Sequence, residues 1–367
     1  ELEGDKNRMA VVFQNLGIEK GDRVIFLIPK SLIFVVAHLA LQKIGALSVP
    51  LNPGFKKSEL VYLLNDAQPK IILSEPGMEA LIRESDPVVT NLIIDTQKPY
   101  HDIKVLGRAS EEFSPVEINP DDPALIIYTS GTTGSPKGTI LTQTNLIHDA
   151  RNIIKIWEIS ESDTLCHALP LFHVHGLCFA LHTSFLVGAS VVMLDTFSPD
   201  RVFEVLSKQQ GELASTLFMA VPTMYSRLMD QPPDVGTDFS HLRLLTSGTA
   251  PLLVRDFGRI RKVLGQEPVE REGMSETGMN FSNPLHGPRK PGSIGLPLPG
   301  LAVRLIDPAT GKDAAQGSEG ELICRGTNVM QGYLNKPDAT ASALQDGWYH
   351  TGDLAKADAN GFLTITG

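Results

Sequence analysis

The feature of this sequence that most restricts its fold is a repeated alternation of short apolar segments with longer amphipathic ones. Residues 23–28 read RVIFLI, which is rich in strand-forming side chains, and residues 31–44 follow with apolar side chains at helical spacing. The alternation recurs along most of the chain. Repeated βα units of this kind predict mostly parallel sheets whose faces are covered by helices.

The same pattern predicts further strands and helices. We expect strands at residues 47–51, 70–73, 91–94, 124–128, 164–169, 189–194, 215–220 and 242–246, and helices at residues 57–66, 78–84, 144–157, 199–209 and 253–264. A linker rich in Pro and Asp at residues 119–123 interrupts the alternation. The fold class that follows is α/β, with two doubly wound sheets.

The texture of the sequence changes near residue 287. From there to residue 367 glycine and proline are dense and the apolar segments are short, which predicts a small antiparallel barrel or sheet. We therefore expect a first α/β subdomain at residues 1–123, a second at residues 124–286 with the site motifs described below, and a β-rich subdomain at residues 287–367.

Composition excludes several classes of protein. The 42 acidic and 32 basic residues give a net charge of −10, which disfavours electrostatic binding to nucleic acid or anionic lipid. Three scattered cysteines are too few for a disulfide framework, so we expect a reducing compartment and a cytoplasmic protein. The uncharged stretch at residues 168–194 could be a membrane span, but Pro170 and three histidines favour a strand followed by a buried helix.

The strongest local signal is the segment YTSGTTGSPKG at residues 128–138. Its glycines allow a tight turn that brings backbone N–H groups close to an anion, its hydroxyls add donors, and Lys137 adds a charge suited to phosphate. We expect the segment to follow a strand and precede a helix. It is not a Walker A loop, because Lys137 lies between Pro136 and Gly138.

Together with other motifs, this loop resembles the signature of the adenylate-forming superfamily, which includes acyl-CoA synthetases, firefly-type luciferases and peptide synthetase adenylation domains. The further motifs, in the family's order, are LPLFHVHG at 169–176, SGTAP at 247–251, EREGMSE at 270–276, GSIGLP at 292–297, GEL and RG at 320–322 and 325–326, and YHTGD at 349–353. The resemblance spans essentially the whole chain.

The resemblance implies a reaction in which a carboxylate attacks the α-phosphate of ATP, pyrophosphate leaves, and the acyl group then passes to CoA. Ser275 would bind the α-phosphate, Asp353 the ribose hydroxyls, and Glu276 a Mg²⁺ ion with Thr129 as a further ligand; Lys137, His173, Ser275 and Glu276 would be the catalytic residues. The implied nucleotide-binding set is Thr129, Ser130, Gly131, Thr132, Thr133, Gly134, Lys137, Gly248, Thr249, Ala250, Glu272, Gly273, Met274, Ser275 and Asp353.

One position departs from the family pattern. The family usually has an aromatic residue before Gly-Met-Thr-Glu, where it stacks on adenine, whereas Glu272 stands here. A carboxylate offers no π face, so we expect weaker adenine binding or another side chain over the ring. Ser275 replaces the family's Thr and keeps its hydroxyl.

Two arginines give information about the acid that the enzyme would activate. The segments around Arg227 and Arg271 line the acyl site in the family, and guanidinium groups there favour a second carboxylate. These segments resemble malonyl-CoA synthetases, which activate malonate and often methylmalonate. The resemblance implies that Arg227 and Arg271 bind the distal carboxylate and that His173 lies beside the reacting one.

Structural roles for the same residues stay open. Arg227 could pair with Asp230 on a helix surface, and Arg271 with Glu270 or Glu272. His175 could be a core histidine, and we expect structural roles for His167 and His182. No pair of histidines has convincing zinc geometry.

Malonate–CoA ligation is therefore the favoured function, with ATP, Mg²⁺ and CoA, a place in fatty acid metabolism, no nucleic acid or integral membrane partner, and a monomer or homodimer. A ligase for a monocarboxylic acid, an adenylation domain that loads a carrier protein and a nucleotide-binding module are the alternatives. We also expect the chain to be a fragment that stops before the family's mobile C-terminal domain.

Overall fold

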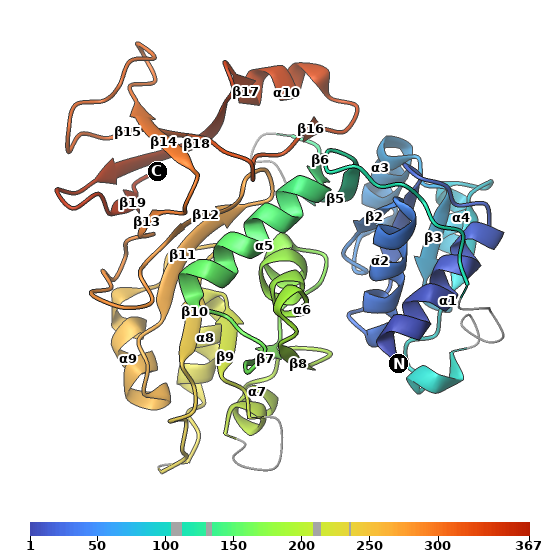
Figure 1. Ribbon diagram of the computed structural model, residues 1–367, viewed down its shortest axis with the longest axis horizontal. Helices are drawn as coiled ribbons and strands as arrows, with labels where there is room; N and C mark the ends of the chain where they lie inside the picture. The colour runs from blue at the N-terminus through green and yellow to red at the C-terminus, as the bar shows by residue number, and fades with distance from the viewer. Residues whose placement is uncertain (104–111, 130–133, 208–213, 235) are drawn as a thin grey trace. The chain divides into compact units, whose positions relative to one another are not determined.

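The structure is a computed structural model that describes residues 1–103, 112–129, 134–207, 214–234 and 236–367. Its internal contacts divide the chain into two units (Figure 1). Unit 1 is Glu1–Thr144 with Met330–Asp338, and unit 2 is Asn145–Val329 with Ala339–Gly367. Each unit contains one of the α/β sheets that the sequence predicts.

Unit 1 is built on a mixed sheet in the strand order β16-β6-β5-β2-β1-β3-β4. The pairs from β5 to β4 are parallel, and β6 is antiparallel to both β5 and β16. Its elements are α1 (Leu2–Asn15), β1 (Arg23–Leu27), α2 (Leu32–Ile44), β2 (Leu47–Pro50), α3 (Lys57–Ala67), β3 (Ile71–Ser74), α4 (Glu79–Ser85), β4 (Thr90–Ile93), the 3₁₀ turn η1 (Tyr100–Asp102), β5 (Pro123–Thr129), β6 (Lys137–Thr142) and β16 (Gly332–Tyr333).

Strand β1 shows why this sheet carries helices on both faces. Ile25 and Leu27 belong to a buried cluster with apolar side chains of α3 and α4. Between them, Phe26 meets Phe34 of α2 with ring centroids 4.8 Å apart. Neighbouring strand residues point to opposite faces, so both faces are covered and the strand is apolar throughout, as its sequence predicts.

Unit 2 contains a second sheet in the order β13-β12-β11-β10-β9-β7-β8 and a small antiparallel sheet in the order β14-β15-β18-β17, with β19 on β18. The elements up to the end of the second sheet are α5 (Gln143–Trp157), β7 (Thr164–His167), the π-helical segment η3 (His175–His182), α6 (Thr183–Val187), β8 (Ser190–Met193), α7 (Pro199–Leu206), β9 (Leu217–Ala220), α8 (Pro222–Asp230), β10 (Leu244–Ser247), α9 (Val254–Leu264), β11 (Val269–Met274), β12 (Gly278–Ser282) and β13 (Leu296–Pro297). The elements that follow are β14 (Ala302–Ile306), β15 (Gly320–Arg325), α10 (Pro337–Ala343), β17 (Leu344–Gln345), β18 (Trp348–Ala357) and β19 (Leu363–Ile365). Helices α5 and α10 each begin at a boundary between the two units.

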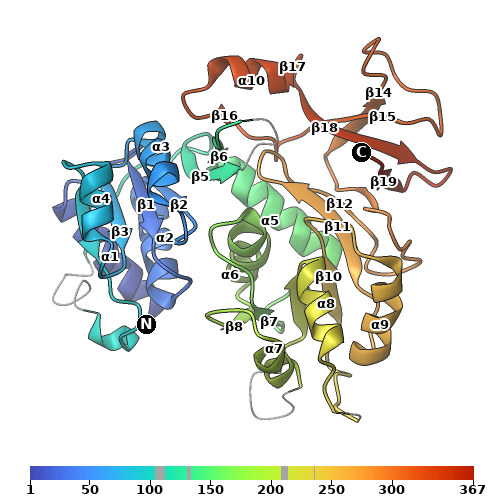
Figure 2. The same cartoon turned by 180° about the vertical axis from the view of Figure 1, so that it is seen from behind.

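In unit 2 the parallel strands from β8 to β11 form the core with helices α7, α8 and α9. Phe218 of β9 and Leu245 of β10 pack in one buried cluster with Tyr225 of α8 and Ile260 of α9. Helix α5 packs on β12, where the indole N–H of Trp157 donates to Ser282 Oγ at 3.0 Å. Figure 2 shows α5 beside the β11–β12 hairpin, which this bond ties to the helix at Ser282.

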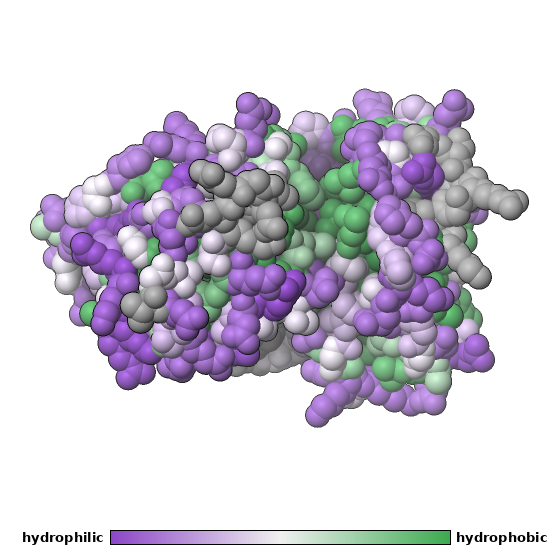
Figure 3. All heavy atoms as spheres, turned by 90° about the horizontal axis from the view of Figure 1, so that it is seen from below, coloured by the Kyte–Doolittle hydropathy of each residue, from purple (hydrophilic) through white to green (hydrophobic). Residues whose placement is uncertain are grey.

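The predicted α/β class and the β-rich C-terminal part are both confirmed by these sheets. The stretch at residues 168–194 holds η3, α6 and β8 instead of one long helix, and none of the helices in the described residues is long and apolar enough to cross a membrane. Hydrophilic residues are widespread on the face drawn in Figure 3, with apolar residues in smaller groups.

Two expectations about organisation differ from the structure. The sequence predicts that β5 opens the second subdomain, but this strand pairs with β2 in the first sheet, so the contact boundary follows Thr144 instead of residue 123. The loop at residues 128–138 joins two antiparallel strands instead of a strand and a helix. The reason is the β-branched run in β6, which pairs Thr139 with Ile127 before α5 begins at Gln143.

Candidate active site

The motif at residues 270–276 leaves the parallel sheet and turns into a hairpin. Strand β11 pairs in parallel with β10 and antiparallel with β12, with a register shift between Glu272 and Gly273. A Cβ on Gly273 would lie 2.6 Å from the carbonyl oxygen of Gly278 and 3.2 Å from Phe179. The two strands can approach this closely because residue 273 has no side chain.

Two amide side chains hold the turn of this hairpin, residues 275–277. Asn280 Nδ2 donates to Thr277 Oγ1 at 2.7 Å, and Asn328 Nδ2 donates to the Thr277 carbonyl. Ser275 is partly exposed on this turn, whereas Glu276 is 8% exposed. The predicted pair therefore lies on a turn that two amide side chains anchor at Thr277.

Arg271 is the most unusual residue of the hairpin. It is 3% exposed, and none of its three guanidinium nitrogens has a hydrogen-bond partner among the described residues. Its guanidinium carbon lies 5.2 Å from the ring centroid of Phe179, and a Cβ on Gly248 would come within 2.7 Å of it. Burial lowers the pKa of Arg271 to about 10, while Glu272 and Asp149 oppose the shift, so the side chain is a cation at neutral pH.

The ion pairs suggested for Arg271 are not present in the described part of the chain. The Glu270 carboxylate instead accepts from the backbone N–H of Gly292 at 2.8 Å, and the Glu272 carboxylate accepts from Asn280 at 3.1 Å. A buried cation without an acceptor is costly, since it has lost its water and gained no partner. The arrangement is suited to an anionic ligand.

His175 lies in the electrostatic field of Arg271. It is 5% exposed, and neither ring nitrogen has a partner among the described residues. Burial, followed by the charge of Arg271 and the neighbouring His167 and His173, holds the pKa of His175 well below its ordinary value. The ring is neutral at physiological pH. His167, in contrast, contacts the Gly176 carbonyl at 2.9 Å, as a structural histidine does.

A buried carboxylate supports the same hairpin from α5. Asp149 Oδ1 accepts from the backbone N–H of Met279 at 2.9 Å, and Gly278 has φ +63° with room only for a hydrogen above that oxygen. Burial raises the pKa of Asp149 to about 7, against the hydrogen bond from Met279 and the charge of Arg271. Nothing in the sequence pattern singles out Asp149.

Glu272 of the hairpin and Asp353 of β18 are two further carboxyl groups of the predicted site. Burial raises the pKa of Glu272 to about 7, the bond from Asn280 lowers it, and the charge of Asp353 raises it further. Asp353 lies on β18, where its own backbone N–H donates to Thr351 Oγ1 at 3.0 Å, and burial raises its pKa. Two carboxyl groups from β11 and β18 therefore influence each other.

The segment at residues 248–250 follows the carboxyl end of β10. Gly248 is buried against Arg271, and Thr249 and Ala250 are exposed. Thr249 has φ +79°, a conformation that a β-branched residue rarely adopts and that often marks a functional loop. Carboxyl ends of parallel strands are the usual place for ligand sites in such sheets.

The structure leaves two predicted acid-binding residues at the surface. Arg227 is exposed on α8, with its guanidinium carbon 4.9 Å from the ring centroid of Phe197. Asp230 pairs with Arg259 at 3.3 Å and not with Arg227. His173 is exposed beside Phe172, with ring centroids 4.6 Å apart.

In unit 1, the phosphate loop is described at its two ends. Thr129 Oγ1 donates to the Lys137 carbonyl at 3.5 Å, and Tyr62 Oη donates to the Pro136 carbonyl at 2.8 Å. Lys137 Nζ lies 4.5 Å from the ring centroid of Tyr333, and Gly134 is exposed. The remaining predicted loop residues lie outside the described residues: Ser130, Gly131, Thr132 and Thr133.

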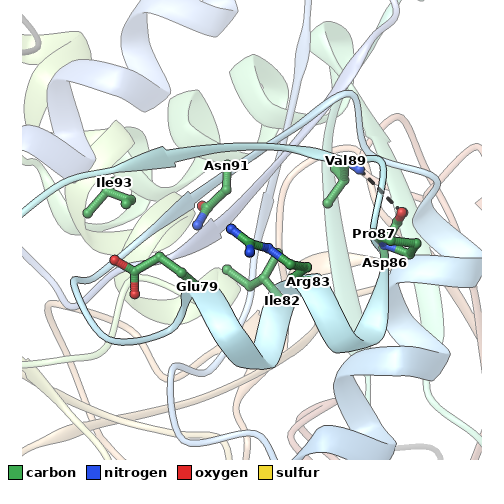
Figure 4. A pocket seen from close by; sticks show the side chains of 8 residues that line it. All are labelled: Glu79, Ile82, Arg83, Asp86, Pro87, Val89, Asn91 and Ile93. Carbon is green, nitrogen blue, oxygen red and sulfur yellow. Dashed lines mark hydrogen bonds between the residues drawn. The ribbon is translucent and has the colours of Figure 1, made fainter.

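Unit 1 also carries a surface pocket of about 310 Å³ beside α4 and β4 (Figure 4). Arg83, Asn91 and Glu79 line it, and Asp86 at its rim accepts from the backbone N–H of Val89 at 3.2 Å. None of its lining residues belongs to the predicted site. The described residues also contain no group of three or more His, Cys, Asp or Glu side chains placed to hold a metal ion by themselves.

Comparison with known proteins extends these observations. The sequence model of the AMP-binding enzyme family matches residues 1–334. The mitochondrial malonate–CoA ligase of Mus musculus is 36% identical over 369 residues, which cover 91% of this chain and 62% of that protein. An oxalate–CoA ligase of Arabidopsis thaliana is 34% identical over 364 residues, covering 96% of this chain and 70% of that protein.

Solved structures agree with the fold. The crystal structure of apo MatB from Rhodopseudomonas palustris matches with a TM-score of 0.93 and 35% sequence identity, over 100% of this chain and 72% of that chain. The present chain thus spans less than two thirds of the mouse ligase and nearly three quarters of the bacterial structure.

Proposed function

Because this chain belongs to the family of AMP-binding enzymes, we propose that it serves an acid–thiol ligase whose acid is malonate or a close dicarboxylate. In the first step, a carboxylate oxygen of the acid attacks the α-phosphorus of ATP, and the bond to pyrophosphate breaks. In the second step, the thiolate of CoA attacks the acyl carbon, and AMP leaves. The relatives named for malonate and oxalate support this choice of acid.

The observation that carries the proposal is the buried, unpartnered guanidinium of Arg271. A fatty or aryl acid would place apolar atoms against this cation and leave it without an acceptor. A second carboxylate accepts two hydrogen bonds from one guanidinium group in a fork geometry. We keep Arg227 as a further proposed contact to the distal carboxylate and His173 as a residue beside the reacting one.

The roles of the nucleotide-binding residues are proposals of the same kind. In unit 2, Ser275 is assigned to the α-phosphate, Asp353 to the ribose hydroxyls, and Gly248, Thr249 and Ala250 to the adenine. Gly273 and Met274 supply backbone beside it. In unit 1, the loop from Thr129 to Gly134 with Lys137 is assigned to the β- and γ-phosphates. Catalysis would then depend mainly on positioning and charge stabilisation.

The carboxylate of Glu276 is a suitable ligand for Mg²⁺. Mg²⁺ prefers oxygen ligands, and it is usually held by one or two carboxylates together with substrate phosphates. Glu276 offers one buried carboxylate on the turn of the hairpin, which suits an ion that arrives with ATP and takes its remaining ligands from the phosphates. Thr129 is proposed as an additional ligand. When bound, the ion would neutralise charge that develops on phosphate oxygens.

The experiment that tests the proposal is acid-dependent release of pyrophosphate with malonate, acetate, octanoate and 4-coumarate. We expect malonate to be preferred and Arg271→Ala to lower kcat/KM for malonate by about 100-fold or more, since it removes one partner of a buried charge pair. Arg255→Ala, at an exposed arginine of α9, is the matched control. Activity with octanoate and none with malonate would contradict the proposal.

The same assay separates the other proposed functions. Transfer to a phosphopantetheine protein and not to free CoA would indicate a carrier-loading adenylation domain, and nucleotide binding without acid-dependent turnover a binding module. A cytoplasmic location, a role in fatty acid metabolism and a monomeric or dimeric state are also proposals. Fractionation of cells and light scattering of the purified protein would test location and assembly.

A further inference from the structure

Arg271 and His175 together hold five buried nitrogens that have no hydrogen-bond partner among the described residues. Both side chains are at least nine-tenths buried, and both border Phe179, whose ring centroid lies 5.2 Å from the Arg271 guanidinium carbon and 6.1 Å from the His175 ring centroid. Buried polar groups in folded proteins are nearly always paired. Two such exceptions that border the same aromatic ring indicate one ligand whose acceptor atoms reach both side chains, so Arg271 is only one part of that site.

The chemistry of His175 decides which ligand atom it would contact. A neutral imidazole has one N–H donor and one acceptor nitrogen, whereas a carboxylate only accepts. We propose that His175 is a second recognition residue for the distal carboxylate of the acid, to which it donates one ring N–H beside the guanidinium of Arg271. This inference rests on the proposed function and adds a specificity-determining residue to it.

The walls of the site fit a short acid. The Arg271 guanidinium carbon lies 5.2 Å from the ring centroid of Phe179, and the backbone of Gly248 lies so close that a Cβ there would fall 2.6 Å from Nε. Phe179 and Gly248 therefore limit the space around the guanidinium. An acid without a second carboxylate would leave Arg271 and His175 unpaired, and such a site discriminates strongly against the analogue that lacks the matching group.

The local backbone fixes His175 in place. It is the first residue of the π-helical segment η3, and a Cβ on the next residue, Gly176, would lie 2.1 Å from the Pro170 carbonyl oxygen. Segment η3 therefore packs backbone against backbone at this point. π-Helical turns are rare and occur frequently at functional sites.

The test compares His175→Phe, which removes the donor, with His175→Gln, which keeps an N–H group. Dissociation constants for malonate, propionate and a non-hydrolysable ATP analogue would be measured by calorimetry on the whole protein with Mg²⁺. We expect His175→Phe to weaken malonate binding by about 10-fold or more, with propionate and nucleotide binding unchanged, and His175→Gln to retain most of the affinity. His182→Gln, at the other end of η3, is the control for disturbance of the helix.

The outcomes separate this inference from the function on which it rests. Malonate binding that is unchanged in His175→Phe, or an equal loss for both acids and the nucleotide, would overturn the role of His175 and leave the proposed function standing. Failure of the unaltered protein to bind malonate would overturn both. His175→Leu supplies a smaller donor-free variant if the phenylalanine variant does not fold.

Discussion

At the scale of single residues, Glu272 is the departure with the clearest electrostatic effect. Its carboxyl group has a pKa near 7 and is influenced by Asp353 on β18. Below pH 7 the group is mainly neutral, and above pH 7 it adds a negative charge beside a second carboxylate. Because ATP is an anion and Asp353 is its proposed ribose contact, ionisation of Glu272 opposes binding.

We therefore expect ATP to bind more weakly as the pH rises from 6 to 8. Glu272→Gln should remove this dependence and tighten binding at pH 8 by a factor of up to about 10. Glu272→Tyr, which supplies a π face, should tighten it as well. Calorimetric titration with ATP at both pH values is the measurement, with the exposed Glu319→Gln as control. Parallel pH profiles for Glu272→Gln and the unaltered protein would contradict the prediction.

The raised pKa of Asp149 leads to a prediction about how the free energy of unfolding depends on pH. Its pKa is raised to about 7 in the folded state, so between pH 4 and pH 7 the folded protein keeps a proton that the unfolded chain has lost. The free energy of unfolding from this group therefore falls as the pH rises through that window, and the loss is complete above it.

Asp149→Asn keeps an oxygen that accepts from the Met279 N–H and removes the charge. We expect it to be more stable than the unaltered protein at pH 8, on the order of 2 kcal/mol, and nearly equal to it at pH 4. Urea unfolding at the two pH values measures the difference. A variant that is less stable at pH 8 would show that the charge of Asp149 is needed near Arg271.

At the scale of elements, Gly176 lets η3 pack closely against the segment that precedes it. Any side chain at this position would overlap the Pro170 carbonyl oxygen, and the nearby Leu169 Cβ would be 3.2 Å away. We expect Gly176→Ala to lower the free energy of unfolding by about 1–3 kcal/mol or more.

The control for this prediction is a second glycine within a helix. Gly258 of α9 has nothing within 4 Å of the position that a Cβ would take, so Gly258→Ala should raise stability by up to about 1 kcal/mol. Urea midpoints for both variants make the comparison. Equal effects of the two substitutions would mean that η3 relaxes around residue 176 at little cost.

The elements also show what the sequence can and cannot predict. Periodicity was sufficient for α2, and the structure adds its two caps: Ser31 accepts from the Phe34 N–H, and Gly45 closes the helix in a left-handed conformation. Periodicity was insufficient for η3, because its close packing of Gly176 against the Pro170 carbonyl is a contact that the sequence pattern does not reveal. It also missed β6, since a strand that follows a glycine-rich loop is recognised only by its partner β5.

The same limit applies to the candidate site. Arg271 could be proposed from the sequence because its motif carries it, and the structure adds that the side chain is buried without a partner. His175 and Asp149 could not be assigned from the sequence, because their burial and their nearness to a charged group arise only when the chain has folded. Arg227 illustrates the reverse case, since its motif favours the acid site whereas its side chain lies over Phe197 at the surface.

At the scale of the whole molecule, the segment Met330–Asp338 belongs to unit 1 although it follows nearly all of unit 2 in the chain. Gly332 and Tyr333 pair with Ile140 and Thr139 of β6, and the N–H of Leu334 donates to the Gly138 carbonyl at 2.8 Å. Without this segment β6 would be an edge strand with unpaired backbone groups.

We therefore expect a fragment of residues 1–144 to be less stable than unit 1 in the whole chain, and a peptide of residues 328–338 added in excess to raise its melting temperature. Circular dichroism melts with this peptide and with a scrambled one are the measurement. A melting temperature that neither peptide changes would show that β6 does not need β16.

The return of Met330–Asp338 also has a consequence for how the protein is made. A ribosome delivers residues in order, and nascent domains generally fold as they emerge. The edge of β6 that pairs with β16 therefore stays unpaired until residue 333 leaves the exit tunnel. Most of unit 2 has been synthesised by that time. Translation speed across the intervening codons thus sets how long that uncovered strand is available to chaperones or to other nascent chains.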